Sequence, residues 1–500
     1  MRGATARTHR HARRISPHRR RGNRRGPHRA CDIMTIKSSS RRQRSMPGSA
    51  TISIWGTLLA VAMTVFMLFG GSSSGGLAAN ITSQLIASLL LGLAVTQLGS
   101  APLSRSAKVL LAIVACWIVW CAVQLVPLPP SIWTLAPGRD LLEHRLQMAG
   151  VPLPWLPLTL SVDGTIRHLT SLLPPLAIGG LILVRPPEDS SALRWVIPLV
   201  ALVSLMVGVA QFLGGQSSPL YFYQTTNLGM SVGLMANANH QATLMLCAIP
   251  FVASLATGEA GRSRESRGRE LLLVAMTAML LLGIAISNSY AAFILAVPVV
   301  AASWAIARPR SLGPARYIAV GIAVVMAAAL AAVLIVGPNA LDSKSGIGDI
   351  QLSRPMMYAV AAKAALYFFP FGSGFGSFVS AFKLFEDPAQ ISNVFVNHSH
   401  SDYLELALEG GLPGILLVMG LLLWWCRQAV VIWFARAPRR LDRAAVVATA
   451  AILAHSAVDY PARTTMVAVI LAAGLALMTT RVTKVKEETA STGGRHLRAE

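Results

Sequence analysis

The chain has 500 residues, of which 54% are hydrophobic and only 13% carry a charge, and its formal net charge is +23. Soluble globular proteins contain about 25% charged residues, so this composition excludes a soluble globular domain. It predicts an all-α protein that crosses a membrane many times.

Most of the positive charge lies at the start of the chain. Residues 1–47 contain 15 Lys or Arg and one acidic residue, Asp32. Such a segment could bind nucleic acid or anionic lipid. We expect instead a disordered cytoplasmic arm or a start codon assigned too early, because Met34 and Met46 are both plausible starts. No nucleic-acid partner is expected, and the segment lacks the cleavage-site pattern of a signal peptide.

Twelve apolar segments have roughly the 20-residue length that crosses the hydrocarbon core of a bilayer. The first nine lie within 48–337 and the last three within 411–480, which leaves 338–410 as a long loop and 481–500 as a tail. The predicted spans are residues 50–70, 78–98, 107–127, 166–185, 194–214, 229–256, 271–287, 290–307, 317–337, 411–434, 444–460 and 465–480.

The distribution of Lys and Arg predicts the orientation of these spans, because cytoplasmic loops carry most of the basic residues. With the basic arm in the cytoplasm, every second turn contains Lys or Arg, as in 262–269 and 436–443. The opposite turns are poor in both residues near the membrane. The pattern predicts that both termini are cytoplasmic and that the loop 338–410 lies on the outer face.

Two predicted spans contain polar groups that need partners inside a membrane. Residues 237–241 read Asn-Ala-Asn-His-Gln, and they could form a functional site or hydrogen bonds between helices. Residues 455–463 read His-Ser-Ala-Val-Asp-Tyr-Pro-Ala-Arg. Their spacing predicts that His455 and Asp459 share a helix face. The simplest interpretation of this segment is an Asp459–Arg463 pair that ties down a short turn.

The loop 338–410 is too long for a plain connection, and its centre, 354–369, reads as a helix. Ser353 is a possible N-cap, and Pro355 fits the first turn. Arg354 would then combine a guanidinium with a helix N-terminus, a combination that suits a pyrophosphate. A plain surface arginine is the alternative.

A glycine-rich turn follows at 370–378, with sequence Pro-Phe-Gly-Ser-Gly-Phe-Gly-Ser-Phe. Its glycines permit tight turns and close approach of backbone segments. It is not a nucleotide-binding loop, because no Lys-Ser or Lys-Thr pair follows it.

The densest group of ionisable residues lies at 397–414, directly before the tenth span. We expect a short helix, capped by Ser399 or Ser401 and ending at 410–411, in which the acidic residues share one face. The two histidines before it could bind zinc with a carboxylate, but they lack the helical spacing of metal sites. Neutral histidine suits a general base better. The ionisable residues are His398, His400, Asp402, Glu405 and Glu409.

Taken in order, these motifs resemble the family of O-antigen ligases and lipid-linked glycan polymerases. The likeness covers about 230–465. It rests on 237–240 (Asn-x-Asn-His), the 353–378 helix and glycine turn, 398–404 (His-x-His-Ser-Asp-Tyr-Leu), 409–414 (Glu-x-Gly-Leu-Pro-Gly) and 455–463.

The resemblance implies a multi-pass glycosyltransferase of the bacterial inner membrane. It implies a donor glycan on undecaprenyl pyrophosphate and an acceptor hydroxyl of a lipid or glycan on the periplasmic side, with no metal or other cofactor. By motif, His400 would be the catalytic base with His398 beside it. Glu409 would anchor the loop helix or orient a histidine, and Arg354 would bind the pyrophosphate.

Further substrate-binding candidates are Asp402 and Asn239. The family often has a Ser-Arg turn at the outer end of the seventh span, whose arginine contacts phosphate. Here residues 287–290 read Ser-Asn-Ser-Tyr, so a second cation would have to come from Arg463 or Lys363.

Other functions are open at this point. A polymerase of the same family, or a relative that glycosylates protein, would use the same donor and a different acceptor. A transporter or flippase would place paired charges near the midplane in repeated, broken helices, and this chain shows no such repeat. A scaffold whose outer loop binds a partner is the last alternative.

Overall fold

The computed structural model describes residues 53–73, 78–99, 103–256, 264–307, 354–388, 396–435 and 438–479. Contacts within the chain separate residues 1–51 from 52–500, so every described residue belongs to the second unit. The basic arm, the ninth predicted span, residues 338–353 with the possible cap Ser353, and the tail lie outside the described residues.

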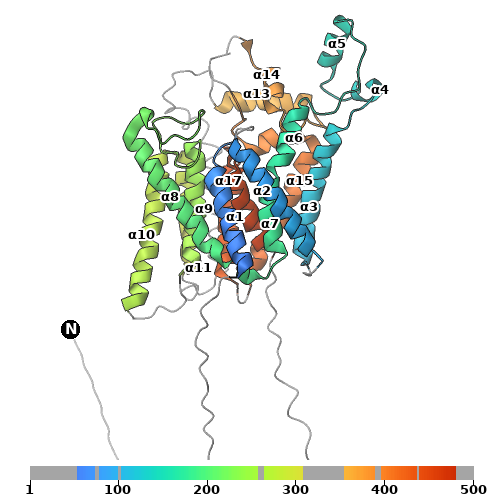
Figure 1. Cartoon of the computed structure of the whole chain (residues 1–500). Coiled ribbons are helices and arrows are strands. Elements are labelled where there is room, and N and C mark those ends of the chain that lie inside the picture. The colour runs from blue at the N-terminus through green and yellow to red at the C-terminus, as the bar shows by residue number, and fades with distance from the viewer. Residues whose placement is uncertain are drawn as a thin grey trace, which may run out of the picture. The chain divides into compact units, whose positions relative to one another are not determined.

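The described residues form helices, with one isolated β-bridge between Leu128 and Leu156 (Figure 1). The all-α class is therefore confirmed for this part of the chain. The longer helices are α1 (Ile54–Phe69), α2 (Ala78–Gln97), α3 (Arg105–Leu125), α6 (Val162–Ser171), α7 (Leu173–Leu183), α8 (Leu193–Gly214), α9 (Ala238–Ser254), α10 (Arg264–Ser287), α11 (Tyr290–Ala307), α13 (Arg354–Tyr367), α15 (Asp402–Trp433), α16 (Arg440–His455) and α17 (Thr465–Leu477). The connections contain α4 (Pro130–Trp133), α5 (Asp140–Met148), α14 (Phe378–Lys383) and the 3₁₀ turns η1 (Pro187–Ala192), η2 (Gly215–Ser217) and η5 (Pro461–Arg463).

Several helices begin where a short polar side chain accepts a hydrogen bond from the first turn, which satisfies one of the N–H groups left unpaired there. The capping residues are Ser53, Ser104, Ser161, Asn237 and Ser401.

Each predicted span that falls on described residues coincides with a helix, and the fourth span corresponds to α6 and α7 together. Seven helical segments in the described ranges are long and apolar enough to cross a membrane: 78–97, 105–125, 162–183, 187–217, 267–287, 290–307 and 402–433. Helices α1 and α17 are apolar but have only 16 and 13 residues. These helices are those of a multi-pass membrane protein, while twelve spans and their orientation stay predictions.

The sixth span is shorter than predicted, because its helix starts only at Ala238. The preceding backbone is held in an irregular loop against α8. Gln211 Oε1 accepts the N–H groups of Val232 and Gly233 at 3.2 and 2.7 Å, and Ser204 Oγ accepts that of Leu234 at 2.9 Å. These side-chain bonds replace the helical ones.

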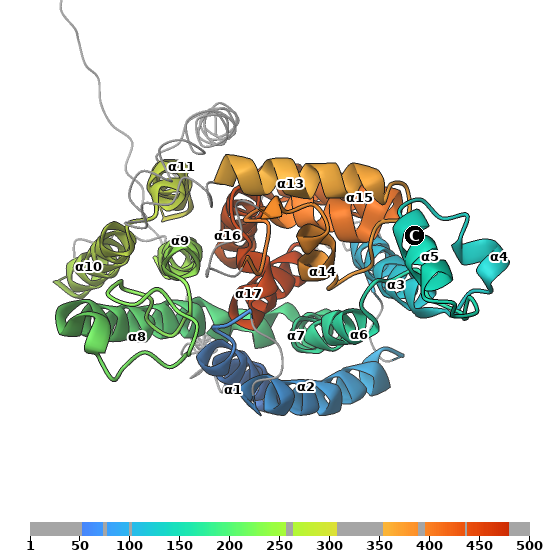
Figure 2. The ribbon, with the colours of Figure 1, turned by 90° about the horizontal axis from the view of Figure 1, so that it is seen from above.

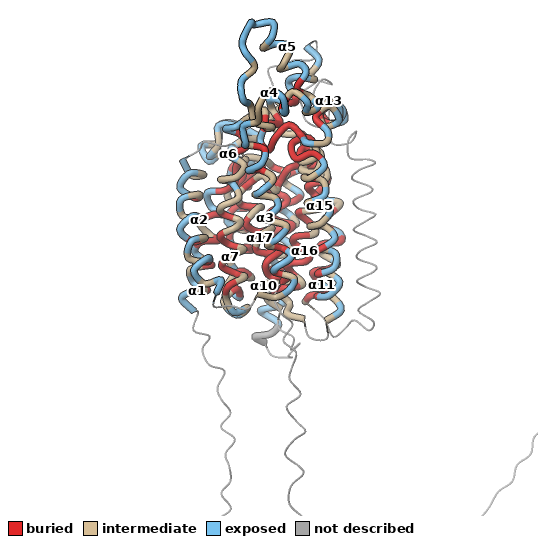
Figure 3. Tube along the Cα trace, turned by 90° about the vertical axis from the view of Figure 1, so that its right-hand side faces the viewer, coloured by how far each residue is buried: buried red, intermediate tan, exposed pale blue. Residues whose placement is uncertain are grey.

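Helix α9 packs against α8, α10, α11 and α16, and Figure 2 shows it among them. Helix α16 faces α9 and α17 with small residues, which let helices approach closely; they are Ala444, Ala445, Ala448, Ala451 and Ala454, all buried. At one point the approach requires glycine, since a Cβ on Gly474 would lie 2.4 Å from Cγ2 of Thr449. Buried positions follow the inner sides of these helices (Figure 3).

Helices α13 and α14 lie at the end of the helices drawn at the top of Figure 1, which we call the loop end. The helix predicted from Arg354 is confirmed as α13, which lies alongside α15 in Figure 2 and contacts it. A small apolar cluster joins α13, α14 and α15, with Met357, Ala361, Phe378, Phe382 and Leu408 among its buried members. This cluster holds the polar start of α15 next to α13.

Candidate functional site

Helix α15 has one break, at Gly411, whose φ of +58° and ψ of −151° lie outside the helical region. Glycine adopts this conformation at little cost because it has no Cβ. The break separates a short polar helix, 402–410, from the apolar helix after it, as the sequence predicted. Ser401 starts the short helix by accepting the N–H of Leu404 at 3.4 Å.

The glycine turn 370–378 supplies partners for the backbone groups that this break releases. The N–H groups of Ser373 and Gly374 donate to the carbonyls of Leu408 and Glu409 at 2.9 and 3.0 Å. A Cβ on Gly372, which has φ +78°, would lie 2.5 Å from the carbonyl oxygen of Glu409. The predicted close backbone approach is thus confirmed, and its partner is the chain's own helix break.

Helix α3 completes this support from the other side. Gln124, which is fully buried, donates from Nε2 to the carbonyl of Glu409 at 3.0 Å and accepts the N–H of Phe375 at 3.1 Å. Trp120 donates from its indole N–H to the carbonyl of Gly410 at 2.9 Å. The end of the short polar helix is therefore held by hydrogen bonds from two other segments, the glycine turn and α3.

Arg463, in η5, binds the three acidic residues of the short helix. Its guanidinium nitrogens lie 3.1 Å from Glu405, 3.1 Å from Glu409 and 3.6 Å from Asp402. The predicted shared face of these residues is confirmed by this arrangement. Burial by itself lowers the pKa of Arg463, but the carboxylates, with Glu405 contributing most, raise it above its ordinary value. Arg463 is therefore a charged link between η5 and α15.

Glu405 connects this group to the first histidine. Its Oε1 lies 2.8 Å from Nδ1 of His398, and its Oε2 accepts the N–H of Ser399 at 2.9 Å. A carboxylate at Nδ1 orients an imidazole and sets its tautomer. Glu405, rather than Glu409, thus orients a histidine, while Glu409 accepts the N–H of Phe378 at 3.0 Å and so anchors α14.

Asp459 lies between α16 and η5 and is fully buried, and three other polar side chains surround its carboxylate. Its Oδ1 is 3.5 Å from Nδ1 of His400 and 3.7 Å from Nε2 of His240, and its Oδ2 is 3.8 Å from Nη2 of Arg354. Burial raises the pKa of Asp459, but the His240 and His400 imidazoles lower it further, to well below its ordinary value. A buried carboxylate therefore faces two imidazoles and one guanidinium.

Three of these atoms make no hydrogen bond to any described residue, although they are buried: Oδ2 of Asp459, Nδ1 of His400 and Nε2 of His240. Buried polar atoms are nearly always hydrogen-bonded, and exceptions often mark catalytic sites. Here the three exceptions lie around one carboxylate.

The backbone of His400 has a φ of +54°, which residues with a Cβ rarely adopt. The hydroxyl of Tyr358 on α13 donates to the His400 carbonyl at 2.9 Å, and the side chain of His400 remains 24% exposed. Strain of this kind concentrates at functional sites. His400 is therefore held at the surface of the buried group with a route to solvent.

The ring of Tyr460 lies among the three histidines. Its centroid is 4.4 Å from that of His398, 4.8 Å from that of His240 and 5.1 Å from that of His400. Aromatic contacts at these distances fix ring orientation. Tyr460 therefore packs the imidazoles into one cluster.

The structure brings together most of the predicted site residues. Arg354 and His400 face Asp459, and His398 pairs with Glu405. Arg463 binds Asp402 and Glu409 in addition to Glu405. Lys363 lies on α13 with its ammonium 5.8 Å from the ring centroid of Phe385, away from these contacts. Asn239 is half-buried on α9, and its carbonyl accepts the Thr243 hydroxyl at 3.0 Å.

Two expectations about 455–463 were wrong. Helix α16 ends at His455, so Asp459 does not share its helix face, and His455 Nδ1 instead lies 2.7 Å from the hydroxyl of Thr243. No Asp459–Arg463 pair forms, because Asp459 faces Arg354 and the histidines. Residues 237–241 fit both interpretations, a functional site and hydrogen bonds that support the helices. Asn237 caps α9 and Gln241 bonds to Ser204 of α8, while His240 lies close to Asp459.

The sequence did not indicate a catalytic or substrate-binding role for Glu405, Asp459, His240 or Tyr460. The signal for His240 was its place in a polar run inside a span. The spacing of the acidic residues places Glu405 on the shared face of 402–409, but it does not indicate which carboxylate contacts a histidine. Although histidines and carboxylates gather here, the described residues contain no group of three or more arranged to hold a metal ion; metal independence stays a prediction.

Residues 275–419 match the family model described as O-antigen ligase, and no curated protein matches the chain. The resemblance predicted from the motifs is confirmed for this segment. It contains Arg354, His398, His400 and the short acidic helix, while His240, Asp459 and Arg463 lie outside it.

Proposed function

We propose that this chain, with its O-antigen ligase segment at 275–419, is a membrane glycosyltransferase. It moves a glycan from undecaprenyl pyrophosphate to an acceptor hydroxyl at the outer face of the bacterial inner membrane. The observation that carries the proposal is the cluster around Asp459, where His400 and Arg354 meet one buried carboxylate.

His400 is the general base in this proposal. Asp459 faces its Nδ1, so a proton held at Nδ1 leaves Nε2 free to accept one from the acceptor hydroxyl, by the logic of a His–Asp pair. Proton transfer of this kind contributes about 10²–10⁴-fold in rate. The partial exposure of His400 supports this role. His398, paired with Glu405, lies beside it.

Arg354 is the cation for the donor pyrophosphate. As the C1–oxygen bond of the sugar breaks, negative charge grows on the leaving phosphate, and a positioned cation stabilises it. Arg354 Nη1 donates to the Val458 carbonyl at 3.0 Å, which fixes the guanidinium near His400. Its place at the start of α13 adds the favourable end of a helix dipole.

Arg463, considered above as a second cation for the donor, is assigned here to positioning. Three carboxylates surround it, so little of its charge remains for a phosphate. Its proposed role, with Asp402 and Glu409, is to hold the acidic helix against η5. That keeps His400 next to the buried Asp459.

The outer location rests on the arginines at the opposite end of the helices. Arg194, Arg269, Arg439 and Arg440 lie at or near the starts of α8, α10 and α16, and α8 and α10 start at the end opposite α13 in Figure 1. His400 bonds to Tyr358 and Asp459 faces Arg354, both on α13, so the two lie at the loop end. Basic residues mark the cytoplasmic side, which supports an outer position for the loop end.

The proposal is tested with the purified full chain in lipid and a glycan on undecaprenyl pyrophosphate. We expect His400→Ala and Arg354→Ala to abolish glycan transfer, while His144→Ala and Arg145→Ala, on exposed positions of α5, keep it. Normal transfer by His400→Ala would reject the assignment. Transfer to further repeat units, in place of a different acceptor, would identify the polymerase of the same family.

A further inference from the structure

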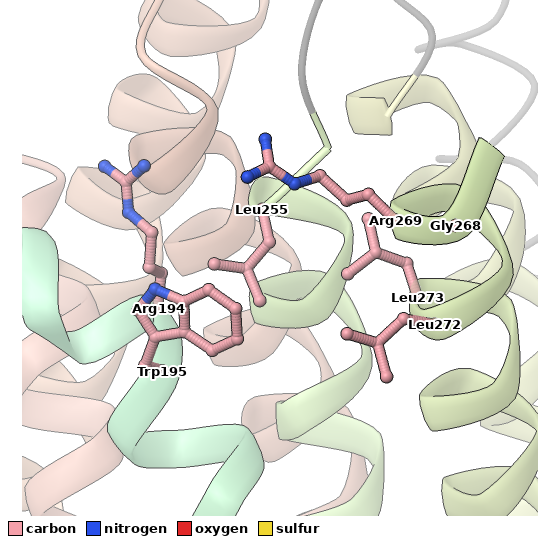
Figure 4. Close-up of a pocket in the computed structure, with 7 residues that line it drawn as sticks. All are labelled: Arg194, Trp195, Leu255, Gly268, Arg269, Leu272 and Leu273. Atoms are coloured by element: carbon pink, nitrogen blue, oxygen red, sulfur yellow. The ribbon is translucent and has the colours of Figure 1, made fainter. Parts of the chain in front are cut away.

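A second site lies at the other end of the helices, where two cavities adjoin each other. The first, of about 460 Å³, lies between α8, α9 and α10 (Figure 4). The second, of about 520 Å³, extends towards α16. They share Arg194 and Leu255, so together they form one cleft.

The cleft is strongly basic. Arg194, Arg269, Arg439 and Arg440 line it, against one acidic residue, Glu188. Arg439 binds Asp442 at 2.6 Å, but neither Arg194 nor Arg269 forms an ion pair with a carboxylate of the described residues. Arg194 lines both cavities, together with Arg269 in the first and Arg439 in the second. An anion in the cleft would balance this positive charge.

The rest of the cleft is apolar. Leu255, Leu272 and Leu273 line one part of it with the ring of Trp195, while Figure 4 shows the Arg194 and Arg269 guanidiniums beyond them. A soluble anion would contact the arginines alone. A phospholipid would contact both parts of the cleft, the arginines with its phosphate and the leucines with an acyl chain.

Tryptophans place this cleft at the level of lipid headgroups. Trp195 is 45% exposed and Trp304, near the end of α11, is 50% exposed. Trp55 stacks under Arg185 at 4.4 Å, and Trp433 under Arg443 at 5.0 Å. Tryptophan gathers at the membrane–water boundary, so the arginines of the cleft lie where phosphates are.

We propose that this cleft binds an anionic phospholipid, with its phosphate between Arg194 and Arg269 and one acyl chain along Leu255, Leu272 and Leu273. Basic pockets between membrane helices bind such headgroups, and each arginine near the membrane surface contributes about fivefold in affinity. The site is separate from the Asp459 cluster and does not depend on the proposed transferase function.

The test titrates the full chain in neutral detergent with phosphatidylglycerol or phosphatidylcholine of the same acyl chains, followed by native mass spectrometry. We expect the wild type to prefer phosphatidylglycerol at least tenfold, and Arg194→Gln/Arg269→Gln to lose most of that preference. The matched control, Arg145→Gln/Arg167→Gln, removes equal charge elsewhere and should keep it. An unchanged preference in the first variant overturns the proposal. So does displacement of phosphatidylglycerol by millimolar inorganic phosphate, which would identify a soluble anion.

A second measurement does not depend on the arginine variants. Phosphatidylglycerol with brominated acyl chains quenches the fluorescence of nearby tryptophan. At low lipid concentration, we expect a smaller fraction of the tryptophan fluorescence to be quenched in Trp195→Phe than in the wild type. Equal quenching in that variant and the wild type overturns the acyl-chain position.

Discussion

His400 Nδ1 lies 3.5 Å from Oδ1 of Asp459, although His400 precedes α15 and Asp459 follows α16. The backbone holds these two segments together. The N–H of Asp402 lies within hydrogen-bonding distance of the carbonyls of Ser456 and Asp459, at 2.9 and 3.1 Å. The packing of two helix ends therefore sets the geometry of the proposed base.

Asp459→Asn tests this relationship. The amide has nearly the same shape but no charge, so it no longer favours a proton at Nδ1 of His400. We expect the rate of glycan transfer to fall by about 10²–10⁴-fold, with the amount of protein in the membrane unchanged. Asp163→Asn, at an exposed position of α6, is the control. A rate within twofold of wild type would show that Asp459 has no part in catalysis.

Tyr358→Phe tests whether the His400 backbone needs support from α13. The change removes one hydroxyl that donates to the His400 carbonyl. A single hydrogen bond contributes about 1 kcal/mol to stability, so we expect little change in melting temperature. The rate should fall by about tenfold, because His400 leaves its strained conformation more often. Equal loss of rate in Tyr221→Phe, whose hydroxyl bonds to Met230 and Gly229 and not to His400, would show that the effect is not specific.

The sequence predicts the helices well because long apolar segments and helix caps are local signals. The end of the short acidic helix at 410–411 and the shared face of Asp402, Glu405 and Glu409 both follow from spacing. The start of α9 does not, because side chains on α8 hold the preceding backbone out of the helix.

The pairing of charges could not be predicted, because it depends on how separate helices pack. Spacing alone favours Asp459 with Arg463, which are four residues apart, yet Asp459 faces Arg354 and Arg463 faces the acidic helix. The glycine turn also needed the structure, since its partner, the break at Gly411, is close to it only in space.

Arg463→Lys separates a positioning role from a donor-binding one. A lysine keeps the charge, but its compact ammonium cannot replace the planar guanidinium, whose three nitrogens each face a different carboxylate. We expect a loss of about 3 kcal/mol in stability, the magnitude for breaking buried ion pairs, seen as a lower melting temperature in detergent. The KM for the donor should stay within about twofold in protein that remains folded. A large rise in KM with an unchanged melting temperature would return Arg463 to the donor site.

Gly372→Ala tests the contact between the glycine turn and the break in α15. Alanine at this position would have to adopt a φ of +78°, and its Cβ would lie 2.5 Å from the carbonyl oxygen of Glu409. We expect a loss of about 3 kcal/mol or more, since strain and steric overlap each cost about 1–3 kcal/mol. Glycan transfer should fall with it, because the acidic helix and His400 lose their fixed position.

Gly150→Ala is the matched control, because Gly150 has a similar φ of +65° but no atom within 4 Å of an added Cβ. It should show only the cost of a left-handed backbone, about 1–2 kcal/mol, and keep its transfer activity. Melting temperature in detergent and transfer rate are compared for both variants. Equal losses in the two would mean that the backbone conformation alone matters, and that the contact with Glu409 does not hold the site in place.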